Sequence, residues 1–371
     1  MDKRLECIKK LKTKDTSDLT MVIGFDGFKD EIIHAIDKRI DAEHYQRIDT
    51  IGRFAQRIAK ASGLSTNIEL LPVQQKIGGN GPIMCNALSQ HTKRITYIGA
   101  LGYPTIDDVF QEMTDRIETV YSIADNGHTD ALEFDDGKLL FGKMESLKDV
   151  SYEMLIDTVG EDRLIDILGH TDLLATVNWS MLPNMTDLWQ RIIRNILPRI
   201  PVARLKPILF IDLADPEKRP DEEIRAALDL LKAFKSHFRV ILGLNQKEAY
   251  DIAINLNLGS VNATLKDINA ALYHYTDIDG VVVHPVDRSS VYMDDKYYEA
   301  LGPYFRKPKL TTGAGDNFNS GFVLGLLLGL VPEEALLTGM STSGFYVSKA
   351  KSPTLEELIE FMEDWANGSI G

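Results

Sequence analysis

The chain has 371 residues, of which 44% are hydrophobic and 26% are charged. This length and composition are typical of one large globular domain, or of one such domain with a small appendage. The formal net charge of −14 argues against a general nucleic-acid binder, which normally carries a basic surface. It does not argue against an anionic ligand, because a few backbone amides can bind phosphate within an acidic protein.

Cysteine usage and hydropathy predict a cytoplasmic protein. Only Cys7 and Cys85 occur, which is too few for a disulfide framework and does not form a zinc motif. The charged N-terminus lacks the apolar core of a signal peptide. The longest apolar stretch, residues 321–331, is about half of what a bilayer requires, so we expect a buried helix and no membrane partner.

Apolar runs alternate with helical patterns along most of the chain. This alternation predicts a mostly parallel sheet with helices on both faces. The expected strands of this α/β sheet lie at residues 173–177, 208–212, 239–244 and 280–284, and earlier strands are expected at 19–24 and 94–99.

Several early segments do not fit that sheet. Residues 129–142 have the pattern of a β-hairpin with Asp-Gly at its turn, and an amphipathic helical pattern covers residues 48–58. We predict a single domain over residues 1–371, with a small β lid formed by residues 30–37, 67–77 and 120–143.

The most informative segment runs from Leu310 to Phe318 and reads Leu-Thr-Thr-Gly-Ala-Gly-Asp-Asn-Phe, followed directly by an apolar helix. Glycines at a helix N-terminus leave backbone amides free to bind one anion, and the helix dipole favours negative charge there. A carboxylate in the first turn, here Asp316, is placed to accept the proton of an attacking hydroxyl during phosphoryl transfer. The plain alternative is an N-capping Asp after a tight turn.

Thr311–Asp316 resembles the C-terminal signature of the ribokinase-like (PfkB-type) carbohydrate kinases, Asp-Thr-x-Gly-Ala-Gly-Asp. The resemblance implies a three-layer sandwich with a β lid and Asp316 as catalytic base. It also implies an anion hole formed by the amides of Gly313, Ala314 and Gly315. Leu310 stands where the family has its leading Asp, a position linked to a monovalent cation or to structure.

The same resemblance implies ATP and Mg²⁺ as cofactors. Asn245 and Glu248 fit the family's Asn-x-x-Glu motif, which organises Mg²⁺ and phosphate, although Asn is also a common helix cap. Thr312 is expected near the nucleotide, whereas the direct Mg²⁺ ligands stay unassigned. His284-Pro285 replaces the usual Thr-x-Gly near the nucleotide, and a lone strand-end histidine is more often packed than functional.

Acceptor-binding residues are expected near two glycines after the strand at 67–77. Gly78 and Gly79 resemble the family's N-terminal Gly-Gly signature, in which the backbone approaches the sugar, and Asn80 follows them. An Asp shortly after the first strand contacts the sugar in relatives. Asp30 and Asp26 both remain candidates for that role.

We therefore predict an ATP-dependent kinase that phosphorylates a hydroxyl of a sugar or a related small polyol. One alternative is a catalytically weak sugar or nucleotide sensor on the same fold, and another is a kinase for a nucleoside or vitamin. A homodimer is an open possibility.

Overall fold

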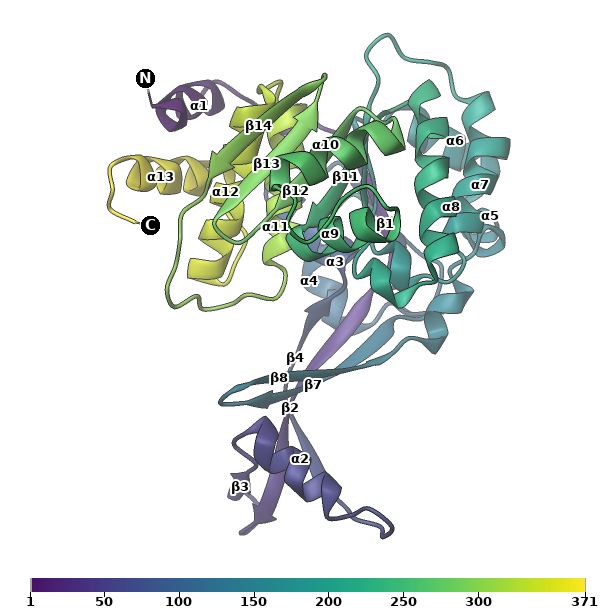
Figure 1. The fold of residues 1–371 in the computed structure, drawn as a ribbon. Helices are drawn as coiled ribbons and strands as arrows, with labels where there is room; N and C mark the ends of the chain where they lie inside the picture. The colour runs from purple at the N-terminus through teal and green to yellow at the C-terminus, as the bar shows by residue number, and fades with distance from the viewer. Residues whose placement is uncertain (1, 371) are drawn as a thin grey trace.

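A computed structural model describes residues 2–370 (Figure 1). It contains one large and one small β-sheet. The strands of the large sheet are β1 (Met21–Phe25), β5 (Ile95–Gly99), β6 (Thr119–Ser122), β9 (Leu173–Thr176), β10 (Ile208–Asp212), β11 (Arg239–Asn245), β12 (Gly280–His284), β13 (Arg288–Met293) and β14 (Lys296–Leu301).

The large sheet has the order β14-β13-β12-β11-β10-β9-β1-β5-β6. Its neighbours from β6 to β12 pair in parallel, whereas β13 and β14 are antiparallel at one edge. The predicted parallel strands are therefore confirmed, and the antiparallel edge was not predicted.

Helices cover both faces of the large sheet. Successive strand residues point to opposite faces and belong to two different hydrophobic clusters, each of which includes its own set of helices. Val22 packs with one set of helices, whereas Met21 and Ile23 pack with the other. The first set is α5 (Tyr152–Val159), α6 (Glu161–Gly169), α7 (Met185–Arg191), α8 (Asp221–Leu231), α9 (Gln246–Asn255) and α10 (Leu265–Thr276). The second set is α1 (Lys3–Leu11), α3 (Asn80–Leu88), α4 (Gln111–Thr114), α11 (Ala314–Leu327), α12 (Pro332–Lys349) and α13 (Leu355–Ala366).

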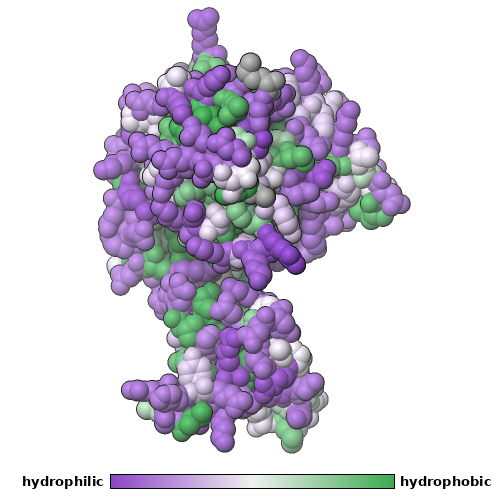
Figure 2. Space-filling view, turned by 90° about the vertical axis from the view of Figure 1, so that its left-hand side faces the viewer, coloured by the Kyte–Doolittle hydropathy of each residue, from purple (hydrophilic) through white to green (hydrophobic). Residues whose placement is uncertain are grey.

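The small sheet is the lid, and it projects from the body in Figure 1. Its elements are β2 (Phe28–Arg39), β3 (Tyr45–Arg47), β4 (Glu69–Gly78), β7 (Gly127–Phe134), β8 (Gly137–Lys143) and helix α2 (Ile51–Ala59). Strand β2 is central and pairs with β4 along one edge, and with β7 and then β3 along the other. Figure 2 shows the lid as a smaller lobe joined to the body by a narrower neck.

The predicted lid segments need one correction. The third segment was expected to start at residue 120, but residues 119–122 form β6 and pair with β5 in the large sheet. The β7–β8 hairpin that follows is confirmed, with Phe134 and Gly137 paired across its turn. Within residues 2–370, none of the helices is long and apolar enough to cross a bilayer.

Candidate active site

The predicted functional residues gather where the lid meets the carboxyl ends of the parallel strands. Strands β10, β11 and β12 end at Asp212, Asn245 and His284, side by side in the sheet. Open α/β sheets bind ligands beyond this edge, because the loops that follow the strands leave a crevice there.

Helix α11 begins at this edge. Its N-cap, Gly313, has φ 88°, a left-handed conformation that favours glycine. The Ala314 amide donates to the Thr311 carbonyl at 3.1 Å. Within residues 2–370, the amides of Gly313 and Gly315 have no hydrogen-bond acceptor. Two of the three predicted anion-binding donors are thus free, and the third is engaged in the turn.

Asp316 lies in the first turn of α11 and is buried. Asn80 Nδ2 donates to Asp316 Oδ1 at 2.8 Å, which joins the start of α3 to the start of α11. Burial raises the pKa of Asp316 to about 8, although the Asn80 hydrogen bond opposes this shift. The charges of Asp26 and Glu248 are smaller causes of the same rise.

A second buried carboxylate, Asp212, was not among the predicted site residues. Its Oδ1 accepts from the Ala214 amide at 2.9 Å, and its Oδ2 accepts from Asn319 Nδ2 at 2.8 Å. Burial raises its pKa well above the ordinary value, and the negative charges of Glu248 and Asp316 add to the effect. The strand-end Asp is the sequence signal that identifies such a residue.

Asn245 and Glu248 form a capping box at the start of α9. Asn245 Oδ1 accepts from the Glu248 amide at 2.9 Å, and Glu248 Oε2 accepts from the Asn245 amide at 2.8 Å. Glu248 Oε1 also accepts from the Asp215 amide at 3.1 Å. The helix-cap interpretation is therefore confirmed, and the carboxylate still lies near the other two acids, as its effect on their pKa values shows.

A cavity of about 160 Å³ lies between the lid and the body. Asp30 on β2 and Lys76 on β4 are register partners and both line it. A Cβ on Gly78 would lie 2.4 Å from the Asp30 carboxylate. A glycine at this position therefore lets the backbone approach the Asp30 side chain closely. The lining residues are Phe28, Asp30, Ile32, Lys76, Gly79, Asn80, Thr129, Ala131, Lys138, Leu140, Asn178, Met181 and Thr312.

Asp26, the other candidate for the acceptor, is fully buried and does not line this cavity. Its carboxylate accepts from the amides of Asn80 and Gly81 at 2.9 and 2.8 Å, and from Asn178 Nδ2 at 2.6 Å. A Cβ on Gly79 would lie 2.7 Å from Asp26 Oδ2. Asp26 thus holds the Gly-Gly turn in place, and of the two candidates only Asp30 lines the smaller cavity.

A larger cavity, of about 360 Å³, lies on the opposite side of the α11 N-terminus. His284 lines it, packs on the Phe318 ring at 4.8 Å between centroids, and has its pKa lowered to about 4 by burial. It is therefore neutral and packed, as the sequence favoured. The lining residues are Asn245, His284, Pro285, Val286, Pro303, Tyr304, Phe305, Pro308, Thr311, Ala314, Gly315, Phe318, Met340, Ser343, Gly344 and Val347.

Thr312, expected near the nucleotide, lines the smaller cavity, and Thr311 lines the larger one. The chain turns between them into α11, so consecutive threonines face different cavities. Sequence reasoning also missed Lys76, Lys138 and Asn178, because their approach depends on the pairing of distant segments.

Comparison with known proteins decides the family. The model of the family described as prokaryotic ketohexokinase matches residues 2–365. The chain belongs to the prokaryotic ketohexokinase family. A ketohexokinase from Haloferax volcanii is 25% identical over 344 residues, which cover 92% of this chain and 90% of that protein. A 5-dehydro-2-deoxygluconokinase from Bacillus subtilis is 30% identical over 124 residues, 32% of this chain and 37% of that protein.

Solved structures show the same fold. Arabidopsis thaliana ribokinase, complexed with ribose and ATP, has a TM-score of 0.63 and 14% identity, covering 94% of this chain and 99% of that one. Thermotoga maritima ribokinase has a TM-score of 0.60 and 16% identity, covering 93% and 99%. The predicted ribokinase-like fold is confirmed. This member of the ketohexokinase family is a carbohydrate kinase that phosphorylates a small sugar with ATP.

Proposed function

We propose that the enzyme transfers the γ-phosphate of ATP to a hydroxyl of a ketohexose, with Asp316 as the base. The observation that carries this proposal is the Asn80–Asp316 hydrogen bond of 2.8 Å at the junction of the two cavities. Asn80 and Thr312 line the smaller cavity, whereas Ala314 and Gly315 line the larger one. The base therefore stands between the place for an acceptor and the place for a nucleotide.

The acceptor would bind in the smaller cavity, between lid and body. Asp30 accepts and Lys76 donates hydrogen bonds from opposite positions of the same strand pair, which suits a ligand rich in hydroxyl groups. Asn80 would orient the Asp316 carboxylate toward the attacking hydroxyl. A positioned base typically contributes a factor of about 10²–10⁴ to the rate.

ATP would bind in the larger cavity. Its apolar lining, including Phe318 and Met340, suits the adenine ring of a nucleotide. The free Gly313 and Gly315 amides suit a phosphate. These amides would bind the transferring phosphoryl group where negative charge develops. The neutral His284 would contribute packing.

Mg²⁺ fits the acidic edge of the sheet. Asp212 and Glu248 lie near Asp316, and burial raises the pKa of each, so the unliganded site carries more carboxylate than it can keep ionised. Carboxylate oxygens are the ligands that Mg²⁺ prefers, often through water and substrate phosphates. Mg²⁺ would offset negative charge on the nucleotide, and Asp212 and Glu248 would hold it.

The test is Mg·ATP turnover of the wild type on ketohexoses, aldoses, sugar acids, sugar phosphates and nucleosides. Asp316→Asn should lose about a hundredfold or more in kcat on the preferred acceptor. Asp229→Asn, at an exposed position on α8, is the matched control and should retain activity.

Three outcomes contradict the proposal. Turnover confined to nucleosides or to sugars other than ketohexoses overturns the acceptor assignment. Full activity in Asp316→Asn overturns the base. If no acceptor is turned over while sugars raise the melting temperature, the alternative of a catalytically weak sensor is favoured.

A further inference from the structure

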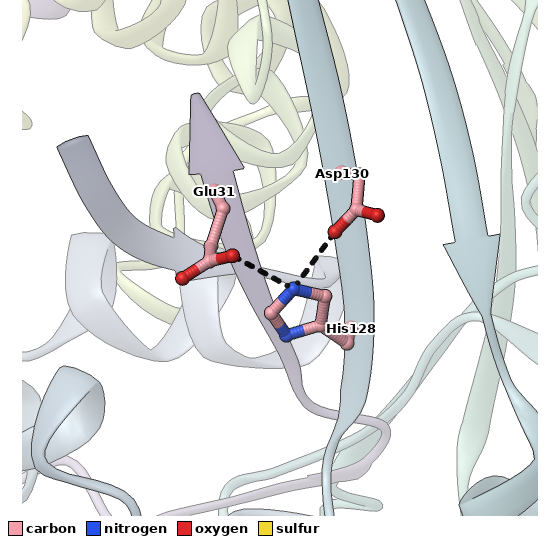
Figure 3. A group of neighbouring side chains, drawn as sticks. All are labelled: Glu31, His128 and Asp130. Carbon is pink, nitrogen blue, oxygen red and sulfur yellow. Dashed lines mark ion pairs between the residues drawn. The ribbon is translucent and has the colours of Figure 1, made fainter. Parts of the chain in front are cut away.

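Three side chains of metal-ligating type converge on the lid. Glu31 lies on β2, and His128 and Asp130 lie on β7, where Glu31 and Asp130 are register partners. In Figure 3 the two carboxylates point at the same ring nitrogen of His128. Successive residues of a strand point to opposite faces, so Asp30 and Thr129 face the acceptor cavity whereas this cluster lies on the other face of the sheet.

The spacing of these atoms suits a small cation. His128 Nε2 lies 3.2 Å from Glu31 Oε2 and 3.0 Å from Asp130 Oδ1, and the three ligand atoms all lie within 4.8 Å of one another. A tetrahedral ion about 2.1 Å from each ligand atom needs those atoms about 3.4 Å apart, which is close to both distances from His128 Nε2. Without an ion, one imidazole N–H must serve two carboxylates.

Each carboxylate is also held by a side chain of a neighbouring lid strand. Gln75 Nε2, on β4, donates to Glu31 Oε1 at 2.5 Å. Lys143 Nζ, on β8, lies 2.9 Å and 2.8 Å from the two Asp130 oxygens. Ligating carboxylates in metal sites are typically oriented by such hydrogen bonds. All four long lid strands thus contribute to one arrangement. Asp130 Oδ1 is shared between His128 and Lys143, so an ion bound there would displace the Lys143 ammonium toward Oδ2.

We propose that Glu31, His128 and Asp130 bind a divalent transition-metal ion such as Zn²⁺, with water in the remaining position. An imidazole ligand favours Zn²⁺ or Co²⁺ over Mg²⁺, so this site differs from the Mg²⁺ site proposed near the nucleotide. The ion would tie β2 to β7 directly behind Asp30 and Thr129. It would therefore stabilise the side of the lid that faces the acceptor, independently of the chemical step.

The probe is Co²⁺ added to the full-length protein after treatment with a chelator, without nucleotide and in excess Mg²⁺ that fills sites of oxygen ligands. Calorimetry and visible absorption should show one Co²⁺ bound per chain. His128→Gln should weaken binding by about a hundredfold or more, since even loss of an outer hydrogen bond costs about ten- to hundredfold. Zn²⁺ should displace Co²⁺.

The matched control is His34→Gln, another lid histidine, whose Nδ1 lies 3.0 Å from the Tyr45 hydroxyl; it should bind Co²⁺ like the wild type. Equal Co²⁺ binding in His128→Gln and wild type overturns the proposal, as does the lack of binding to the wild type. Should His128→Gln fail to fold, the wild type alone remains decisive. Zn²⁺ must then slow amide exchange in residues 28–36 and 127–134, and unchanged exchange there overturns the site.

Discussion

The large sheet has helices on both faces. In residues 2–370 the lid sheet has only helix α2, which packs on it at the end farthest from the active site (Figure 1). Ile33, Ala35, Leu132 and Phe134 of the lid strands form a small apolar cluster with Phe54 of α2. Nearer the body, the lid instead presents polar and charged side chains on both faces.

This difference assigns the two tasks to different regions: the large sheet provides stability, and the lid provides groups for ligand recognition. A sheet covered on both faces obtains its stability from buried apolar area, and its functional groups lie only at the strand ends. The lid leaves whole strand faces free, so one short strand pair can place Asp30 and Lys76 against a ligand. The cost is a smaller core, from which we expect lower local stability.

The sharpest way to break this comparison is to remove one aromatic side chain from each region. Phe54 packs against Phe134 with ring centroids 5.4 Å apart, and Phe234 is buried in the body. Each Phe→Ala change should cost about 3 kcal/mol, the lower end for buried phenylalanine. Hydrogen exchange should show that Phe54→Ala loses protection in β2 and β7 only, whereas Phe234→Ala destabilises the body. Equal loss in β10 after Phe54→Ala would mean that lid and body unfold together.

A smaller effect is expected when the two acids near the first strand are compared. Asp30→Asn removes a charged acceptor from the smaller cavity and should lower kcat/KM by about ten- to hundredfold, from about 1.5–3 kcal/mol of lost hydrogen bonding. Asp26→Asn should instead lower the melting temperature, because an amide NH₂ would face the donors that Asp26 now accepts from. Steady-state kinetics and thermal unfolding of both variants distinguish the roles. Unchanged kinetics of Asp30→Asn would contradict a role of this lid residue in acceptor binding.

The two lysines of the smaller cavity sharpen the same point at a lower magnitude. Lys138 pairs with Glu133 at 2.8 Å, whereas no carboxylate of residues 2–370 lies within 4 Å of the Lys76 ammonium. Burial lowers the pKa of Lys76, while Asp30 opposes that shift. Lys76→Met should raise KM for the acceptor about tenfold, the value of about one good hydrogen bond. Lys138→Met should change KM less, and a larger effect of Lys138→Met than of Lys76→Met would contradict the assignment.

The contrast between the regions also explains which features could be predicted from the sequence. The parallel strands and the α11 site depend on local patterns, namely apolar runs, helix periodicity and glycines before an Asp. Lys76 faces Asp30 only because β4 pairs antiparallel with β2 in one register, and single-sequence patterns do not specify that register. Asp212 was overlooked as a functional acid because its proximity to Asp316 follows from the sheet order. Which cavity Thr312 lines depends on a single turn of the backbone, and a sequence pattern does not specify that detail.

The last expected effect concerns the unliganded body, where Asp316 should reduce stability at neutral and alkaline pH. Its pKa is raised from an ordinary value near 3.8 to about 8, so between these values the folded state binds the proton that the unfolded state has released. Stability therefore falls as pH rises through this window.

Asp316→Asn keeps an oxygen for Asn80 and does not ionise, so its melting temperature should exceed that of the wild type at pH 8. The difference should disappear at pH values well below 3.8, where both states of the wild type hold the proton. A constant difference at all pH values would show that Asp316 is ionised in the free enzyme. If Mg²⁺ binds beside Asp316 as proposed, Mg·ATP should also narrow the gap at pH 8.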